Sequence, residues 1–122
     1  MIAEGQIVLF KFSQSEQTEG KLRPALVLRE LPGKYEDWLI CMISSQVHQR
    51  LPELDEMITP EDSDFLESGL RYPSVIRTSR IAIVNNKILL GRLGHIGNER
   101  LQRIRQNLAN WIRGELENHT RV

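Results

Sequence analysis

Six residues of this chain carry side chains suited to binding phosphate, and each falls at an end of an expected strand. They are Arg23, Ser44, Ser45, Gln46, Ser74 and Arg77. An arginine offers a permanent charge and a planar fork of donors that fits a phosphate or a carboxylate, and hydroxyl and amide groups add hydrogen bonds. The set indicates chemistry or binding at a phosphate. Periodicity alone does not show that the six side chains meet in space.

Arg23 is the residue of this set whose position is most constrained. Pro24, which follows it, cannot donate to a strand ladder and therefore suits the first residue of the apolar run 24–28. The same proline biases Arg23 toward extended backbone. We therefore expect Arg23 at the mouth of a rigid strand. The alternative is an arginine that only caps the strand or pairs with a surface acid.

Other kinds of chemistry find no support in the residue pattern. His48, His95 and His119 are not paired at metal-ligand spacing and have no cysteine partner. The segment 91–94 (Gly-Arg-Leu-Gly) lacks the Lys-Ser/Thr and the spacing of a phosphate-binding loop. Cys41 lies inside an apolar run, which favours a buried thiol over a nucleophile. We expect no metal and no cofactor.

The composition is that of an ordinary globular domain. The chain has 122 residues, of which 40% are hydrophobic and 26% charged, and we expect one domain over residues 1–122. A single cysteine fits a reducing compartment. Neither a signal-peptide pattern nor a membrane-length apolar run is present in the sequence, so we expect a cytoplasmic protein that makes no membrane contact.

The formal net charge of zero hides an asymmetry along the chain. Residues 51–67 are rich in acids and lack Lys and Arg, whereas residues 70–113 are rich in Lys and Arg, with Glu99 as their one acid. A local basic surface could hold a polyanion. Basic helix faces are also common where they serve only solvation.

Hydrophobic patterning predicts short strands followed by one helix. Strands are expected over 6–12, 24–29 and 37–44, over 73–77, and over 80–84 as a continuation or a separate strand. Residues 13–20 read as a loop.

Local signals predict the remaining elements. Thr59 and Pro60 predict the start of a short helix that ends near Ser68 and Gly69. Asn85 and Asn86 predict a hairpin turn, and Gly91, Gly94 and Gly97 predict breaks before the last element.

The last element is the clearest. Asn98 is a suitable cap, and the residues after it repeat an apolar face at helical spacing, with Arg100 and Arg103 on the polar face. The apolar positions are Leu101, Ile104, Leu108, Trp111, Ile112 and Leu116. Short strands closed by one helix predict a small, mainly β barrel.

Four segments together resemble the PemK/MazF family, the toxins of type II toxin–antitoxin pairs. They are Gly5–Leu9, Lys21–Leu28, Ile43–Gln46 and Ser68–Arg77. Each is weak alone, but their order and spacing match the family over nearly the whole chain. The resemblance implies an SH3-like barrel, a small twisted antiparallel sheet with a C-terminal α-helix, in a homodimer. It also implies a metal-free endoribonuclease that cuts single-stranded RNA by attack of the ribose 2′-OH, leaving a 2′,3′-cyclic phosphate. A cognate antitoxin would block the RNA groove.

The resemblance also assigns roles to particular residues. Arg23 matches the arginine of the family's Arg-Pro motif and would neutralise charge on the phosphate. Ser44 matches the position where many members carry a catalytic threonine, and Arg77 matches an arginine that acts in one branch. Glu19 lies near an acidic or amide position beside the Arg-Pro motif. The residues expected to contact RNA are Lys21, Ser45, Gln46 and Ser74.

One departure from the family pattern bears on catalysis. Where one branch has an aspartate base two residues after its second arginine, this chain has Ser79, which cannot act as a base at neutral pH. Glu19 is the nearest substitute. Three functions therefore stay open: a toxin endoribonuclease, a module on the same scaffold that binds antitoxin or RNA without cutting, and a structural interaction protein.

Overall fold

A computed structural model describes residues 2–12 and 21–115. This part of the chain forms six strands, two α-helices and two 3₁₀ turns. The strands are β1 (Gln6–Phe12), β2 (Lys21–Glu30), β3 (Asp37–Ser44), β4 (Glu56–Ile58), β5 (Ser74–Asn85) and β6 (Leu89–His95). The helices are α1 (Phe65–Ser68) and α2 (Asn98–Ile112), and the 3₁₀ turns span Val47–Gln49 and Asn86–Ile88.

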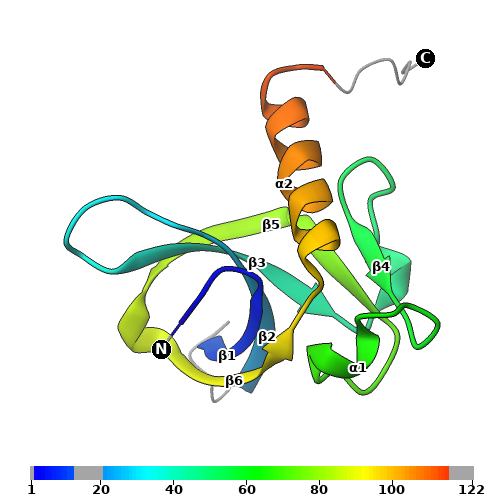
Figure 1. Cartoon of the computed structure of the whole chain (residues 1–122), viewed down its shortest axis with the longest axis horizontal. Coiled ribbons are helices and arrows are strands. Elements are labelled where there is room, and N and C mark those ends of the chain that lie inside the picture. Colours follow the sequence, from blue (N-terminus) through cyan, green and yellow to red (C-terminus); the bar gives the residue numbers. More distant parts are fainter. Residues whose placement is uncertain (1, 13–20, 116–122) are drawn as a thin grey trace.

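The six strands form one antiparallel sheet in the order β4-β5-β3-β2-β1-β6. The expected fold class, mainly β with a C-terminal helix, is confirmed. In Figure 1 the sheet curls and α2 stands against one side of it. Within the described residues the edge strands β4 and β6 are not paired with each other, so the sheet is open where the sequence predicted a barrel.

Helix α1 packs against β6 at two glycines. A Cβ atom on Gly94 would lie 2.1 Å from the carbonyl oxygen of Glu67, and one on Gly69 would lie 2.3 Å from that of Leu93. Gly69 also ends α1 in a left-handed backbone conformation, with φ of 77°. Two backbones that approach this closely leave no room for a side chain, so the glycines allow α1 to lie on the edge strand.

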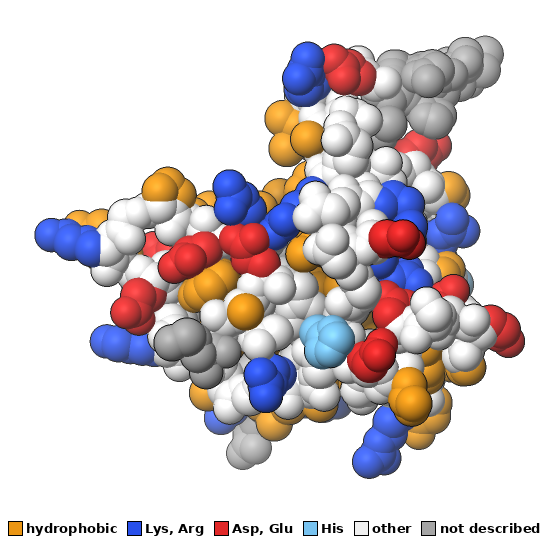
Figure 2. Space-filling view, viewed as in Figure 1, with side chains coloured by type: hydrophobic (Ala, Val, Ile, Leu, Met, Phe, Trp, Pro, Cys, Tyr) orange, Lys and Arg blue, Asp and Glu red, His pale blue; other side chains and the backbone are white. Residues whose placement is uncertain are grey.

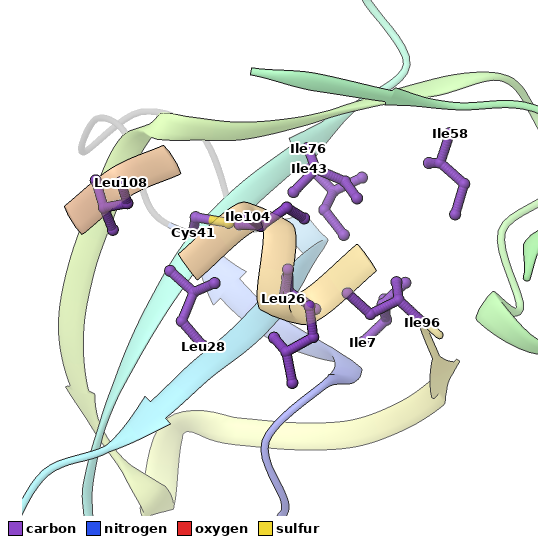
Figure 3. Close-up of a cluster of buried hydrophobic side chains, with 11 residues drawn as sticks. Ile7, Leu26, Leu28, Cys41, Ile43, Ile58, Ile76, Ile96, Ile104 and Leu108 are labelled. Atoms are coloured by element: carbon purple, nitrogen blue, oxygen red, sulfur yellow. The ribbon is translucent and has the colours of Figure 1, made fainter. Parts of the chain in front are cut away.

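Two hydrophobic clusters lie on opposite faces of the sheet. The paired residues Ile7 and Leu26 belong to the first cluster, and the next pair, Val8 and Ala25, belongs to the second. Helix α2 covers the first cluster with buried side chains, two of which are labelled in Figure 3. They are Leu101, Ile104 and Leu108. Because both faces are buried, a slip of one residue would exchange the two sets of side chains, and the register is fixed.

The short helix does not begin at Pro60, as the sequence predicted, but at Phe65. The carboxylate of Asp62 accepts a hydrogen bond from the backbone N–H of Thr59 at 2.8 Å, and this contact closes a turn. The predicted start was wrong because Asp62, two residues after Pro60, binds back to the N–H of Thr59. The predicted end at Gly69 is confirmed.

The hairpin turn predicted at Asn85 and Asn86 is also wrong. Strands β5 and β6, which this segment joins, are not neighbours in the sheet. Asn85 has φ of −82°, and its side chain accepts the N–H of Lys87 at 3.0 Å, which caps a 3₁₀ turn. Strand β6 then runs through Gly91 and Gly94, where breaks were expected.

Helix α2 has the predicted apolar face only over its first three turns. It begins at Asn98, with Gly97 as the cap in place of Asn98. Near its other end Trp111 is 53% exposed and Ile112 is 65% exposed. The apolar spacing therefore predicted the helix correctly, although it wrongly placed Trp111 and Ile112 on the buried face. Leu116 falls outside the described residues.

Arg100 is buried, which corrects the expectation that it lies on the polar face of the helix. Its guanidinium donates to Asp64 through Nε at 2.8 Å and Nη2 at 3.1 Å, and to Glu56 through Nη1 at 2.7 Å. Asp62 lies 3.2 Å from Nη2. A bidentate pair surrounded by further acids is the arrangement in which a buried guanidinium is stable.

The acidic and basic runs of the sequence therefore pair with each other. Arg103 also binds Glu56, through Nε at 2.9 Å and Nη2 at 2.7 Å. Figure 2 shows basic and acidic side chains interleaved along one flank of α2. This pairing fastens α2 to β4 and to the turn before α1, and it neutralises part of the basic run that a polyanion could have used.

Within the described residues, no helix is both long enough and apolar enough to cross a membrane.

Replacing Gly94 with alanine should destabilise the fold by about 1–3 kcal/mol, because the new methyl group would overlap the backbone of α1. Gly91→Ala is the matched control in the same strand, since a Cβ there meets nothing within 4 Å. Urea unfolding of both variants tests this. Equal stability of the two would mean that α1 does not rest on β6.

The Asp64→Asn substitution should lower the unfolding free energy at neutral pH by about 2 kcal/mol or more. Burial opposes ionisation of Asp64, but hydrogen bonds from Arg100 and from the N–H of Gly97 outweigh it and hold the pKa of Asp64 below its ordinary value of 3.8. The stabilisation is therefore complete above that value and is lost as the pH falls through the lower folded pKa.

The difference between wild type and Asp64→Asn should accordingly shrink in acid below pH 3.8, where wild type also loses the charge. Denaturant unfolding at a series of pH values measures it. Glu67→Gln, which changes an exposed acid of α1, is the control. Parallel curves for wild type and Asp64→Asn would contradict the assignment.

Candidate nucleic-acid interface

The strand register brings Arg23, Ser44 and Arg77 to one face of the sheet. Ala25 in β2 pairs with Met42 in β3, and Met42 pairs with Arg77 in β5, so these three side chains form one row across the sheet. Arg23 precedes Ala25 by two residues and Ser44 follows Met42 by two. Both therefore keep the same face and lie one row further toward the same end. We call these three residues the Arg23–Ser44–Arg77 cluster.

The cluster lies at the margin of the second hydrophobic cluster. Arg23 pairs with Phe10 of β1, which is buried there, and Met42 is partly buried against the same side chains. Arg23 is exposed and Ser44 is half-buried. An apolar floor below an exposed guanidinium and a hydroxyl is a surface on which an anionic ligand can bind by its charge while a flat group packs beside it.

Ser44 ends strand β3 and is held by the backbone that follows it. Its Oγ atom accepts a hydrogen bond from the N–H of Gln46 at 2.9 Å. A hydroxyl that accepts one bond can still donate one, so this contact orients Ser44 without using its proton. Ser45 and Gln46 are exposed in the bend before the 3₁₀ turn. The predicted hydrogen-bonding group at the end of this strand thus lies at the surface.

Arg77 is mostly buried, with 16% of its side chain exposed. Its Nη1 atom donates to Oε1 of Gln49 at 3.1 Å, and its Nε atom lies 3.8 Å from Oδ2 of Asp55. The Nε atom is buried and has no hydrogen-bond partner among the described residues. The guanidinium is thus held between an exposed amide and a buried carboxylate.

Asp55 was not expected at this site. The sequence showed it as one acid among many in a segment whose structure was hard to assign, and its spacing carries no signal. Its carboxylate accepts hydrogen bonds from the N–H of Ser79 at 3.0 Å, from Ser79 Oγ at 2.9 Å and from the N–H of Leu51 at 2.9 Å. A buried carboxylate therefore lies next to the position where the sequence lacks an acid.

The predicted phosphate-binding residues do not all meet. Ser74 is buried, and its hydroxyl donates to the carbonyl of Tyr72 at 2.8 Å, which is a contact within its own turn. Lys21 is exposed at the start of β2, near Arg23 in the chain. Glu19 and the rest of the predicted loop 13–20 fall outside the described residues. The role of Glu19 stays a prediction, as does contact with RNA by Lys21, Ser45, Gln46 and Ser74.

Cys41 is fully buried in the first hydrophobic cluster, as predicted. Burial, assisted by the nearby Asp55 carboxylate, raises the pKa of the thiol. A thiol that stays protonated in an apolar environment is a poor nucleophile. Among the described residues, no group of three or more His, Cys, Asp or Glu side chains is arranged to hold a metal ion.

Comparison with known proteins identifies the fold and the family. One solved structure, described as Mycobacterium tuberculosis toxin MazF-mt6, superimposes with a TM-score of 0.65 at 16% sequence identity, over 88% of this chain and 96% of that one. At that identity the similarity establishes the fold alone. A search of curated proteins found no match. The profile of the PemK-like, MazF-like toxins of type II toxin–antitoxin systems matches residues 3–112.

That match covers nearly the whole chain, including the strands that carry Arg23, Ser44 and Arg77. The chain therefore belongs to the PemK-like, MazF-like family of type II toxins.

Proposed function

We propose that this protein is a toxin endoribonuclease that cuts single-stranded RNA at short sequence motifs. The observation that carries the proposal is the Arg23–Ser44–Arg77 cluster, in which two guanidinium groups and a hydroxyl from three adjacent strands share one face and one end of the sheet. Membership of the toxin family supports the same conclusion independently.

The proposed reaction is an internal transesterification of RNA. The ribose 2′-OH attacks the adjacent phosphorus, the bond from phosphorus to the 5′-oxygen breaks, and the products carry a 2′,3′-cyclic phosphate and a 5′-OH. The 2′-OH gives up one proton and the leaving oxygen gains one, so no other reactant is needed. Arg23 would neutralise the charge that builds on the non-bridging oxygens, and the Ser44 hydroxyl would donate to one of them.

Asp55 is not the general base that removes the 2′-OH proton. The Asp55 side chain is fully buried, so it cannot reach a 2′-OH on a surface-bound strand. Glu19 is the acid that the family resemblance suggests. Electrostatic stabilisation by arginine and hydroxyl groups could also supply most of the rate acceleration without a strong base.

The proposal includes the partners expected for such an enzyme. A single strand presents unstacked bases that can be read, together with the 2′-OH that serves as nucleophile. We further propose that the toxin is a homodimer in the cytoplasm, and that an extended segment of a cognate antitoxin covers Arg23. Ser79 in place of an acid keeps the second candidate open, a module that binds RNA or antitoxin without cutting.

The first test is cleavage of a mixed-sequence single-stranded RNA in excess chelator, beside an otherwise identical 2′-deoxy strand. We expect discrete cuts in the RNA only, with cyclic phosphate ends, because the 2′-OH is the nucleophile. The end groups are identified by mass spectrometry. Well-folded protein that makes no cuts would favour the binding module, and cuts in the deoxy strand would exclude the proposed chemistry.

Arg23→Ala should reduce the cleavage rate by about a hundredfold or more, since one group that stabilises the transition-state charge is lost. The variant should stay folded and keep its oligomeric state, because the Arg23 side chain is exposed. Arg29→Ala is the matched control, as Arg29 is another exposed arginine of β2 and pairs with Glu4. Cleavage at the wild-type rate by Arg23→Ala would refute the assignment.

A further inference from the structure

The proposed chemistry gives no role to the carboxylate of Asp55, although this group lies inside the site. Its side chain has no exposed surface, and its oxygens are held by Leu51 on one side and Ser79 on the other. A buried charge is costly unless it meets a partner of opposite sign. Arg77 is that partner, with Nε at 3.8 Å from Oδ2.

An irregularity in β5 brings the carboxylate to this position. Cys41 of β3 pairs with Ile81, but the next residue, Met42, pairs with Arg77. Residues 78–80 therefore bulge out of the ladder. The bulge turns the N–H and hydroxyl of Ser79 to Asp55, so that an acid from the segment before β4 comes to lie beside an arginine of β5.

The guanidinium of Arg77 has an inner and an outer side. The inner Nε is buried beside Asp55, and the outer Nη1 is bonded to Gln49, which is exposed. With its Nε side turned inward, the planar guanidinium leaves its Nη atoms as the donors that can face a phosphate. Charge attraction to Asp55 favours this orientation.

We propose that Asp55 is the positioning residue for Arg77: its buried carboxylate holds the Nε side of the guanidinium inward and thereby presents the Nη side to the scissile phosphate. Ser79 fixes the carboxylate and does not replace a base. The inference rests on the proposed RNA cleavage for its catalytic consequence. The orientation of Arg77 can be measured without any cleavage.

A purely structural role for Asp55 would be to fasten residues 51–55 to β5. Thr78 serves that role without any charge, because its hydroxyl donates to the carbonyl of Leu54 at 2.6 Å. Thr78→Val removes this bond and keeps the shape of the side chain. It is therefore the matched control for Asp55→Asn, which removes the charge beside Arg77.

The first readout is the ¹⁵N–¹H NMR signal of Arg77 Nε, assigned by its absence in Arg77→Lys. In wild type we expect a signal that exchanges slowly with solvent. Asp55→Asn should shift it or abolish its protection, whereas Thr78→Val should leave it unchanged. A protected and unshifted signal in folded Asp55→Asn would overturn the proposal, whether or not the protein cuts RNA.

The second readout is cleavage of single-stranded RNA by folded protein. Asp55→Asn should lower kcat by about ten- to a hundredfold with little change in KM, since a misplaced Arg77 acts mainly at the transition state. Thr78→Val should cut at the wild-type rate per folded molecule. Equal rates for the two variants would overturn the proposal.

This inference and the proposed function can fail separately. If wild type cuts no RNA, the proposed function fails and the NMR signal alone decides the orientation of Arg77.

If Asp55→Asn does not fold, Ser79→Ala takes its place, because it removes the hydroxyl bonds to the Asp55 carboxylate and keeps the bond from the Ser79 N–H. It should also move the Arg77 signal, and an unchanged signal would contradict the inference.

Discussion

Burial of both faces of the sheet fixes how its strands can pair. Neighbouring residues of β1, β2 and β3 alternate between two hydrophobic clusters, so a slip of one residue would place each set of side chains in the wrong environment. The register that results puts Ala25, Met42 and Arg77 in one row. Arg23 and Ser44 share their face for the same reason, and the candidate site is therefore a consequence of core packing.

A second interaction, between arginines and the acidic residues of segment 51–67, holds α2 against β4 and the turn before α1. Arg100 joins α2 to β4 and to the turn before α1 through Glu56, Asp62 and Asp64. Asp55, from the same acidic segment, lies beside Arg77. One stretch of acids thus supplies the charge partners of both the terminal helix and an arginine of the candidate site.

Strands β1 and β3 could be predicted from the sequence with their observed bounds, because apolar runs in a sheet buried on both faces give a strong local signal. The start of α1, the connection between β5 and β6 and the burial of Arg100 could not. Each depends on a partner that is distant in the chain or in the sheet. Arg100, for example, lies four residues before Ile104 and so falls beside the apolar face of the helix, but helical spacing says nothing of the acids that surround it.

The fold class, the family resemblance and the residue types of the cluster can be read from the amino-acid sequence, because strand patterning and motif order are local properties of the chain. That Arg23, Ser44 and Arg77 share one face is known only from the folded sheet, since strand register sets that relation. The contact between Asp55 and Ser79 likewise depends on the fold, because a bulge in β5 and the path of the segment before β4 bring together residues 24 positions apart.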